Sequence, residues 1–166
     1  MAEEGADKKV PIYYDTTLIT EFSLHYRPGL IEFLEDMKTK YELIIYSSLN
    51  KTYVDAIVRC IEENEKYFEY IFGEDFCIFA NISYGVKCLD FLFGNRTKDD
   101  IILVDTTAKS LPFYSDNFVP IPSYCAINAK DYELAKLASL LDLMIAEPSI
   151  PKAITNFREA DAWIIL

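Results

Sequence analysis

Polar side chains that could carry chemistry stand at the ends of three apolar stretches of the chain. Tyr13 ends the first stretch, Ser47 follows the second at residues 43–46, and Asp105 follows the third at residues 101–104. Carboxylates can transfer protons or bind cations, and hydroxyl groups can donate hydrogen bonds to anions. Because ligands bind at the carboxyl ends of the strands in open α/β sheets, these side chains can converge on one site.

The elements that must position these side chains alternate along the sequence. The runs at 43–46 and 101–104 are continuously apolar, which is typical of parallel strands covered on both faces. Apolar residues at helical spacing lie between and after them: Leu30, Phe33, Leu34 and Met37; Tyr53, Ala56, Ile57, Cys60 and Ile61; Leu134, Leu137, Ala138, Leu141, Met144 and Ile145. This alternation predicts an α/β fold with a central parallel sheet flanked by helices.

Several residues predict where elements begin. Proline removes a ladder donor, so Pro11 is expected to be the first residue of its strand. Pro28 suits the first position of a helix, and Asn50 suits the cap of the next. Asn128 with Asp131 three residues later predicts the start of the last helix, which Glu147 and Pro148 end.

Length and composition favour a single globular domain. The chain has 166 residues, 51% of them hydrophobic, with few glycines and prolines, which is enough to bury a sizeable core. We expect an N-terminal extension at residues 1–9, the domain at 10–147 and a C-terminal tail at 148–166.

Four segments in order resemble the motifs of the haloacid-dehalogenase (HAD) phosphatases, whose fold is Rossmann-like. The first motif of that superfamily is D-x-D-x-T, and here Asp15 and Thr17 match its second Asp and its Thr. Ser47 matches the hydroxyl that holds phosphoryl oxygens, Lys87 the charge-balancing lysine, and Asp105 the acidic residue beside the metal. The resemblance extends over residues 10–146.

Two further segments are similar to the small-CTD-phosphatase-like branch of this superfamily. Residues 26–34 resemble its K-R-P-G-x-x-x-F-L entry to the first helix, and residues 115–121 resemble its P-x-N-x-V-P-I segment. Within this branch, residues 46–48, 104–106 and 150–157 are similar to the receptor subunit of the mitochondrial inner-membrane presequence translocase. That resemblance implies a protein-binding role at the mitochondrial inner membrane; otherwise we expect a cytoplasmic protein.

The resemblance also implies that catalysis has been lost. Tyr13 stands where the phosphatases carry the nucleophilic Asp, and a phenol cannot form their acyl-phosphate. Thr106 replaces a second oxygen ligand, so no cofactor is expected and Asp105 is only a weak candidate for a metal ligand. Active members insert a longer flap hairpin after the first motif. Residues 20–25 leave room for a tight turn, which predicts a reduced flap.

Each of these residues also has a simpler structural interpretation. Asp15 could cap a turn, and Ser47 could satisfy backbone groups at a strand end. Lys87 is expected to pair with Asp15 or Asp105 rather than to bind phosphate, and Tyr13 is expected to pack into the former pocket as core. The acidic residues at positions 62–65 are expected to form a solvated helix end.

Composition excludes some functions and favours others. Four cysteines without C-x-x-C spacing and one histidine, His25, argue against zinc. A net charge of -11 argues against nucleic-acid binding and suits a basic subunit or peptide, although acidity can also serve solubility alone. No apolar run is long enough for a membrane span.

These observations predict a pseudophosphatase that acts as a binding or structural subunit of a larger complex, through contacts with other proteins. The apolar C-terminus could dock on a neighbour or pack on its own domain, and its interaction residues would be Trp163, Ile164, Ile165 and Leu166. The alternatives are a soluble receptor for basic presequences and a residual Mg²⁺-dependent phosphatase that uses Asp15.

Overall fold

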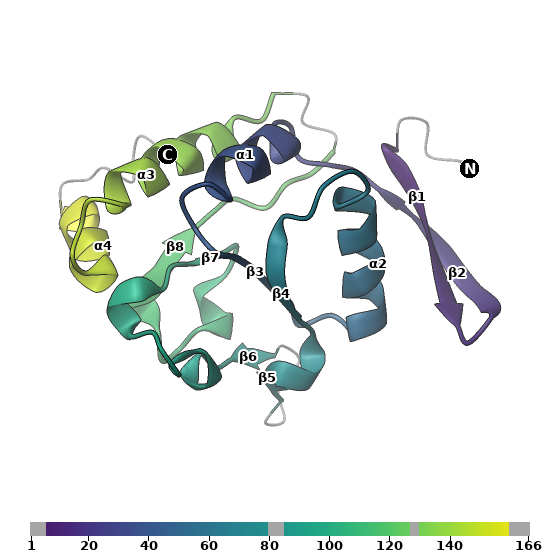
Figure 1. The fold of residues 1–166 in the computed structure, drawn as a ribbon, viewed down its shortest axis with the longest axis horizontal. Coiled ribbons are helices and arrows are strands. Elements are labelled where there is room, and N and C mark those ends of the chain that lie inside the picture. The colour runs from purple at the N-terminus through teal and green to yellow at the C-terminus, as the bar shows by residue number, and fades with distance from the viewer. Residues whose placement is uncertain (1–5, 80–84, 127–129, 160–166) are drawn as a thin grey trace. The chain divides into compact units, whose positions relative to one another are not determined.

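The computed structural model describes residues 6–79, 85–126 and 130–159, and Figure 1 shows its elements. The chain divides into two compact units, one formed by residues 1–76 and 125–130 and the other by residues 77–124 and 131–166. Each unit pairs its strands into two-stranded sheets. The predicted α/β class is confirmed, and the limits of the predicted domain stay a prediction.

The first unit begins with an antiparallel hairpin. Strand β1 (Lys8–Tyr14) pairs with β2 (Thr17–Leu24) in a register from Lys8↔Leu24 to Tyr14↔Thr17. The prediction that the first strand joins a parallel sheet is therefore wrong, as is the tight turn predicted at residues 20–25, which belong largely to β2. A two-residue turn brings the next strand alongside β1 at once, and this local pairing decides the topology.

Pro11 lies inside β1 rather than at its start, which corrects the predicted boundary. It pairs in register with Glu21. Each strand of a two-stranded sheet has one edge without a ladder partner in that sheet, so a missing N–H is tolerated there. The register shifts by one residue after Ile12, because Ile12 pairs with Thr20 and Tyr13 pairs with Leu18.

A parallel pair of strands forms the rest of the first unit with two helices. Strand β3 (Leu43–Tyr46) pairs with β4 (Phe68–Phe72). Helix α2 (Lys51–Ile61) connects the two strands, and α1 (Leu30–Met37) precedes β3 and shares their core. The short 3-10 helix η1 (Glu74–Phe76) follows β4. One buried cluster contains Leu34, Val54, Val58, Tyr67 and Phe68.

Helix α2 also packs against the hairpin, as Figure 1 shows. A second cluster joins its Ala56 to Val10 and Ile12 of β1. Burial of a valine or isoleucine side chain such as Val10 or Ile12 contributes about 1.5–3 kcal/mol. Helix α2 therefore contributes to two cores, whereas the sequence pattern predicted one apolar stripe that included Tyr53, which is exposed.

The helix ends of the first unit follow from local chemistry. The Asn50 side chain accepts a hydrogen bond from the backbone N–H of Thr52, which confirms the predicted cap. Helix α1 begins at Leu30 after Gly29, whose φ of 76° suits glycine, so Pro28 lies before the helix and not at its first position. Glu62 accepts hydrogen bonds from the backbone of Tyr67 and Phe68 and is not merely solvated.

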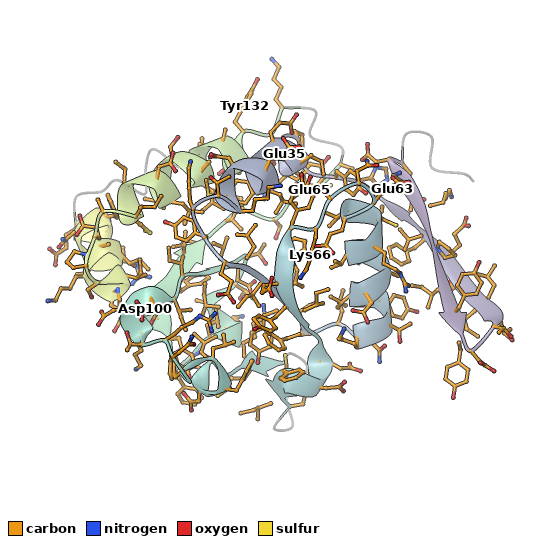
Figure 2. All side chains as sticks on the ribbon, viewed as in Figure 1. Glu35, Glu63, Glu65, Lys66, Asp100 and Tyr132 are labelled. Carbon is orange, nitrogen blue, oxygen red and sulfur yellow. The ribbon has the colours of Figure 1, made fainter. Side chains whose placement is uncertain are left out.

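The second unit contains one antiparallel and one parallel pair of strands. Strand β5 (Cys77–Ile78) pairs with β6 (Val86–Lys87), and β7 (Leu103–Asp105) pairs in parallel with β8 (Phe118–Pro120). Short 3-10 helices connect them: η2 (Asp90–Leu92), η3 (Lys98–Asp100), η4 (Ala108–Ser110) and η5 (Ser115–Asn117). Thr97 and Asp100 form a capping box at the start of η3. Asp100 is labelled in Figure 2.

Two helices complete the second unit. Helix α3 (Glu133–Met144) buries Leu134, Leu137, Leu141 and Met144 as predicted, but Ile145 lies beyond its end and is exposed. Asp131 accepts a hydrogen bond from the N–H of Glu133, while the predicted cap Asn128 lies outside the described residues.

Helix α4 (Ile150–Glu159) was not predicted, because residues 148–166 were interpreted as a tail. Its buried residues Ile150, Ala153 and Ile154 show helical spacing, and Pro151 suits the first turn. Arg158 donates hydrogen bonds to the carbonyls of Ser115 and Phe118. The predicted interaction residues at positions 163–166 lie outside the described part of the chain. Within that part, no helix has the length and apolar character that a membrane crossing requires.

Candidate functional site

Three of the predicted site residues lie around the turn of the β1–β2 hairpin. Tyr13 is in β1, Asp15 is in the turn and Thr17 begins β2. Tyr13 is 51% exposed, so the prediction that it packs as core is wrong. The buried residues of β1 are Val10 and Ile12, and Tyr13 follows the register shift after Ile12 and lies outside their cluster.

Asp15 has a backbone conformation that fits its turn. Its φ is 57°, and it is exposed. Aspartate, asparagine and glycine adopt this left-handed region more readily than other residues do. Its position therefore agrees with a structural role in the turn, and an exposed carboxylate also stays available for proton transfer.

We predict that the turn tolerates Asp15→Gly and Asp15→Asn but not Asp15→Ala. The free energy of unfolding should fall by about 1 kcal/mol for alanine, because in the left-handed conformation its Cβ comes too close to the following carbonyl oxygen. It should stay within about 0.5 kcal/mol for asparagine and glycine. Urea denaturation measures all three. Equal losses for the three variants would contradict the turn role.

Ser47 follows β3 and serves the backbone there. Its hydroxyl oxygen accepts a hydrogen bond from the N–H of Leu49 at 3.1 Å, and its own N–H donates to the carbonyl of Phe72. This agrees with the simpler interpretation of Ser47 as a residue that satisfies backbone groups at a strand end. Ser47 belongs to the β3–β4 sheet, while Asp15 belongs to the hairpin.

In the second unit, the structure brings Lys87 and Asp105 together. The Lys87 ammonium lies 2.6 Å from one carboxylate oxygen of Asp105, and the two side chains are only 12% and 15% exposed. The other oxygen accepts hydrogen bonds from the backbone N–H groups of Thr106 and Thr107. Of the two partners predicted for Lys87, Asp105 is the one observed.

These contacts determine the charge of Asp105. Burial alone would raise its pKa, but the hydrogen bond and charge of Lys87 and the two backbone donors hold the pKa below its ordinary value. Asp105 is therefore a carboxylate at neutral pH. Both of its oxygens accept hydrogen bonds inside the protein, from Lys87 on one side and from the backbone of Thr106 and Thr107 on the other.

No described group of three or more His, Cys, Asp or Glu side chains is arranged to hold a metal ion. Asp105 is the strongest single candidate in the sequence, and its neighbours at this strand end are hydroxyl-bearing threonines. A magnesium ion usually takes carboxylate oxygens and water in octahedral geometry. The residues around Asp105 do not supply that set.

Asn117 is a residue whose role the sequence did not reveal. Its side chain is 1% exposed, and its amide nitrogen donates hydrogen bonds of 2.7 Å to the carbonyls of Lys98 and Ile101. It thereby fixes the segment that leads into β7 and hence the position of Asp105. Its place in the segment at residues 115–121 was the only signal in the sequence.

Comparison with known proteins assigns the family. Residues 2–151 match the NLI interacting factor-like phosphatase family. The chain belongs to this family. The match includes the first unit except for residue 1, the second unit as far as the start of α4, and the motif positions from Tyr13 to Asp105.

Several curated relatives of this NLI interacting factor-like domain carry phosphatase names. Phosphatase Herzog of Drosophila melanogaster is 28% identical over 92% of this chain and 42% of its own length. CTD small phosphatase-like protein 2 of Dictyostelium discoideum is 27% identical over 80% of this chain and 22% of its own length. The human CTD small phosphatase-like protein is 29% identical over 72% and 42%. The chain thus spans less than half the length of these relatives.

Solved structures agree on the fold of the domain. The fission yeast RNA polymerase II CTD phosphatase Fcp1 bound to beryllium fluoride superimposes with a TM-score of 0.58 at 18% identity, over 93% of this chain and 45% of that chain. A second Fcp1 structure gives the same TM-score at 21% identity, over 87% and 41%. The HAD phosphatase fold is therefore established, and the predicted likeness to the translocase receptor stays a prediction.

Proposed function

We propose that this family member has lost phosphatase chemistry and acts as a protein-binding subunit. The observation that carries the proposal is Tyr13 at the place of the nucleophile in the resembled motif. A phenol at that place cannot form the acyl-phosphate that splits the reaction into two steps. Loss of the nucleophile from a cooperative active site costs several orders of magnitude in rate.

The contacts of Asp105 support the same proposal. The Lys87 ammonium neutralises the charge of Asp105, and donors from Lys87, Thr106 and Thr107 reach both of its oxygens, which weakens its attraction for a cation. The pair instead serves as an internal ion pair. Residues of the former site would then stabilise the fold on which a binding surface is built.

The net charge of -11 suits a basic subunit or peptide as partner. With the resemblance to the translocase receptor, it extends the proposal to a complex of the mitochondrial inner membrane. Mild detergent extraction and native separation of the endogenous protein test this extension. Stoichiometric migration with a large complex supports it, and migration as a free particle near 19 kDa contradicts it.

We predict no Mg²⁺-dependent turnover of p-nitrophenyl phosphate above the level of a buffer blank, because the chain lacks the acyl-phosphate-forming carboxylate. The assay compares the purified protein with Asp15→Asn and with EDTA-treated samples. Turnover that needs Mg²⁺ and disappears in Asp15→Asn would overturn the proposal.

That opposite outcome defines the second candidate, a residual Mg²⁺-dependent phosphatase. The names of the relatives favour it, and Asp15 keeps the place of the general acid/base in the resembled motif. Turnover that persists in Asp15→Asn would point to a contaminating enzyme, which repurification removes. A soluble receptor for basic presequences is the remaining alternative, and it requires salt-sensitive binding of a basic amphipathic peptide.

A further inference from the structure

A groove runs between the hairpin and helix α2 within the first unit. Its volume is about 540 Å³, and it is lined by Lys8, Lys9, Val10, Pro11, Tyr13, Ala56, Arg59, Cys60 and Glu63. Sites for small ligands typically enclose about 300–1,000 Å³. The groove is therefore large enough for a few residues of an extended peptide and too small for a helix, whose diameter is about 10–12 Å over its length.

The floor of the groove is apolar. Val10 and Ala56 are buried and belong to one core cluster, against which Cys60 packs. Helix α2 contributes positions 56, 59 and 60, which share one helical face, and Glu63 follows just after the helix. Pro11 and Cys60 also line the groove and are only partly buried, so small apolar side chains of a ligand can lie against them.

The rim of the groove is basic in a chain that is strongly acidic. Lys8, Lys9 and Arg59 face one acidic residue, Glu63, while the whole chain has 16 basic and 27 acidic residues. Lys8 pairs with Glu63, which Figure 2 shows beside the start of β1. The Lys9 ammonium is 4.0 Å from the carboxylate of Glu21. Three basic groups thus meet two carboxylates, Glu63 and Glu21, and the excess along this rim is the single positive charge of Arg59.

Arg59 is the strongest recognition element of the rim. It is exposed in the last turn of α2, and its guanidinium makes no hydrogen bond or ion pair with another described residue. A guanidinium binds a carboxylate through two parallel hydrogen bonds. The chain has many carboxylates, yet none in the described residues pairs with Arg59. The guanidinium is therefore suited to bind a carboxylate of another molecule.

The shape of the groove favours an extended chain over a small anion. Consecutive residues from Lys8 to Pro11 line it, so the edge of β1 that does not pair with β2 borders the groove. Backbone groups at such an edge bind an extended peptide as an added strand. Pro11 donates no hydrogen bond, which confines that pairing to part of the edge.

We propose that this groove binds an extended acidic segment of a partner protein, with its carboxylates against Arg59 and Lys9 and small apolar side chains over Pro11 and Cys60. The inference rests on the proposed protein-binding function and adds a site for an acidic segment of the partner, whereas the net charge of the whole chain suits basic parts of a partner elsewhere on the surface. The acidity of the remaining surface would repel such a segment elsewhere, so the local reversal of charge directs it to one place.

The test uses the full chain and a fluorescein-labelled peptide of four Glu-Val repeats, blocked at both ends. Fluorescence anisotropy at low salt should show saturable binding that weakens as salt rises. Arg59→Glu should raise Kd about tenfold or more, because an attractive charge pair becomes a repulsive one. The neutral variant Arg59→Gln should give a smaller increase, and thermal melting should show that both variants fold.

The matched control is Lys66→Glu, which changes the net charge equally outside the groove. Lys66 is exposed and pairs with Glu69 near β4, as labelled in Figure 2. An equal loss of binding in this control would overturn the proposal, since only the overall charge would matter. Absence of binding at low salt, or equal binding of a Gln-Val peptide, would overturn it as well. Equal competition by free glutarate would overturn the assignment to an extended segment.

Failure of the groove proposal can be distinguished from failure of the proposed function. Native separation of the endogenous complex with and without Arg59→Glu shows whether partners are held at the groove. A complex that persists in the variant contradicts the groove proposal and leaves the protein-binding function intact. Mg²⁺-dependent phosphatase turnover lost in Asp15→Asn contradicts the function and leaves the peptide result to stand by itself.

Discussion

Asn117→Asp is expected to lower the free energy of unfolding by about 3–5 kcal/mol at pH 7, although the two side chains have nearly the same shape. The amide of Asn117 donates to the carbonyls of Lys98 and Ile101 in a buried position. A carboxylate there cannot donate and would face two carbonyl oxygens, and an uncompensated buried charge costs about this much.

The loss in Asn117→Asp should depend on pH in a definite direction. Burial against carbonyl oxygens raises the pKa of the new carboxyl group in the folded state above its unfolded value of about 3.9. The charge penalty is therefore small below pH 3.9 and grows as pH rises toward the folded pKa. Urea denaturation at pH 4 and pH 7 measures the difference.

Asn64→Asp is the control, because Asn64 is exposed and should change stability by less than about 0.5 kcal/mol. A loss for Asn117→Asp that stays the same at both pH values would show that shape or packing, and not the missing donors, determines the effect.

Lys87→Met is expected to lower the free energy of unfolding by about 2–3 kcal/mol at pH 7. The substitution leaves the Asp105 carboxylate largely buried with only its backbone donors, and breaking a buried ion pair by removal of one partner costs about 3–5 kcal/mol. The slight exposure of both side chains and the N–H groups of Thr106 and Thr107 reduce that figure.

The pH dependence follows from the lowered pKa of Asp105. A carboxyl group with a lowered folded pKa stabilises the fold above its unfolded pKa of about 3.9, and this contribution is lost as pH falls through the folded value. Wild type and Lys87→Met should therefore converge in stability under acid conditions. Denaturation curves at pH 3 and pH 7 test this.

Two further variants isolate the pair. Asp105→Asn in the Lys87→Met background should recover part of the loss, since it removes the unpaired charge. Lys66→Met removes an exposed ammonium that pairs with Glu69 and should cost less than about 1 kcal/mol. Equal losses for Lys66→Met and Lys87→Met would show that burial of the pair is unimportant.

Features set by local chemistry could be predicted from the sequence. Asn50 caps α2 because its side chain reaches the N–H of Thr52, two residues away. The stripe in α3 is right as far as Met144. Helix α4 was missed because Glu147 and Pro148 end the preceding helix, and the pattern of Ile150, Ala153 and Ile154 after them was not considered.

Features set by distant partners could not be predicted. The motifs limited the partner of Lys87 to two carboxylates, and only the fold selected Asp105. The exposure of Tyr13 depends on which face of β1 meets α2. The Asn117 side chain donates hydrogen bonds to backbone carbonyls 16 and 19 residues away. Every residue has a backbone carbonyl, so the residue types in the sequence do not indicate which one accepts.

The packing of α2 against the hairpin has a consequence for synthesis on the ribosome. A two-stranded hairpin is only marginally stable by itself in water, and the partner of Val10 and Ile12 is Ala56. Helix α2 ends 37 residues after β2, a delay of about 2–7 s at 5–20 residues per second. The two hairpin strands leave the exit tunnel before the helix and must wait for it before they can hold their structure, and during that interval chaperones have access to their apolar faces.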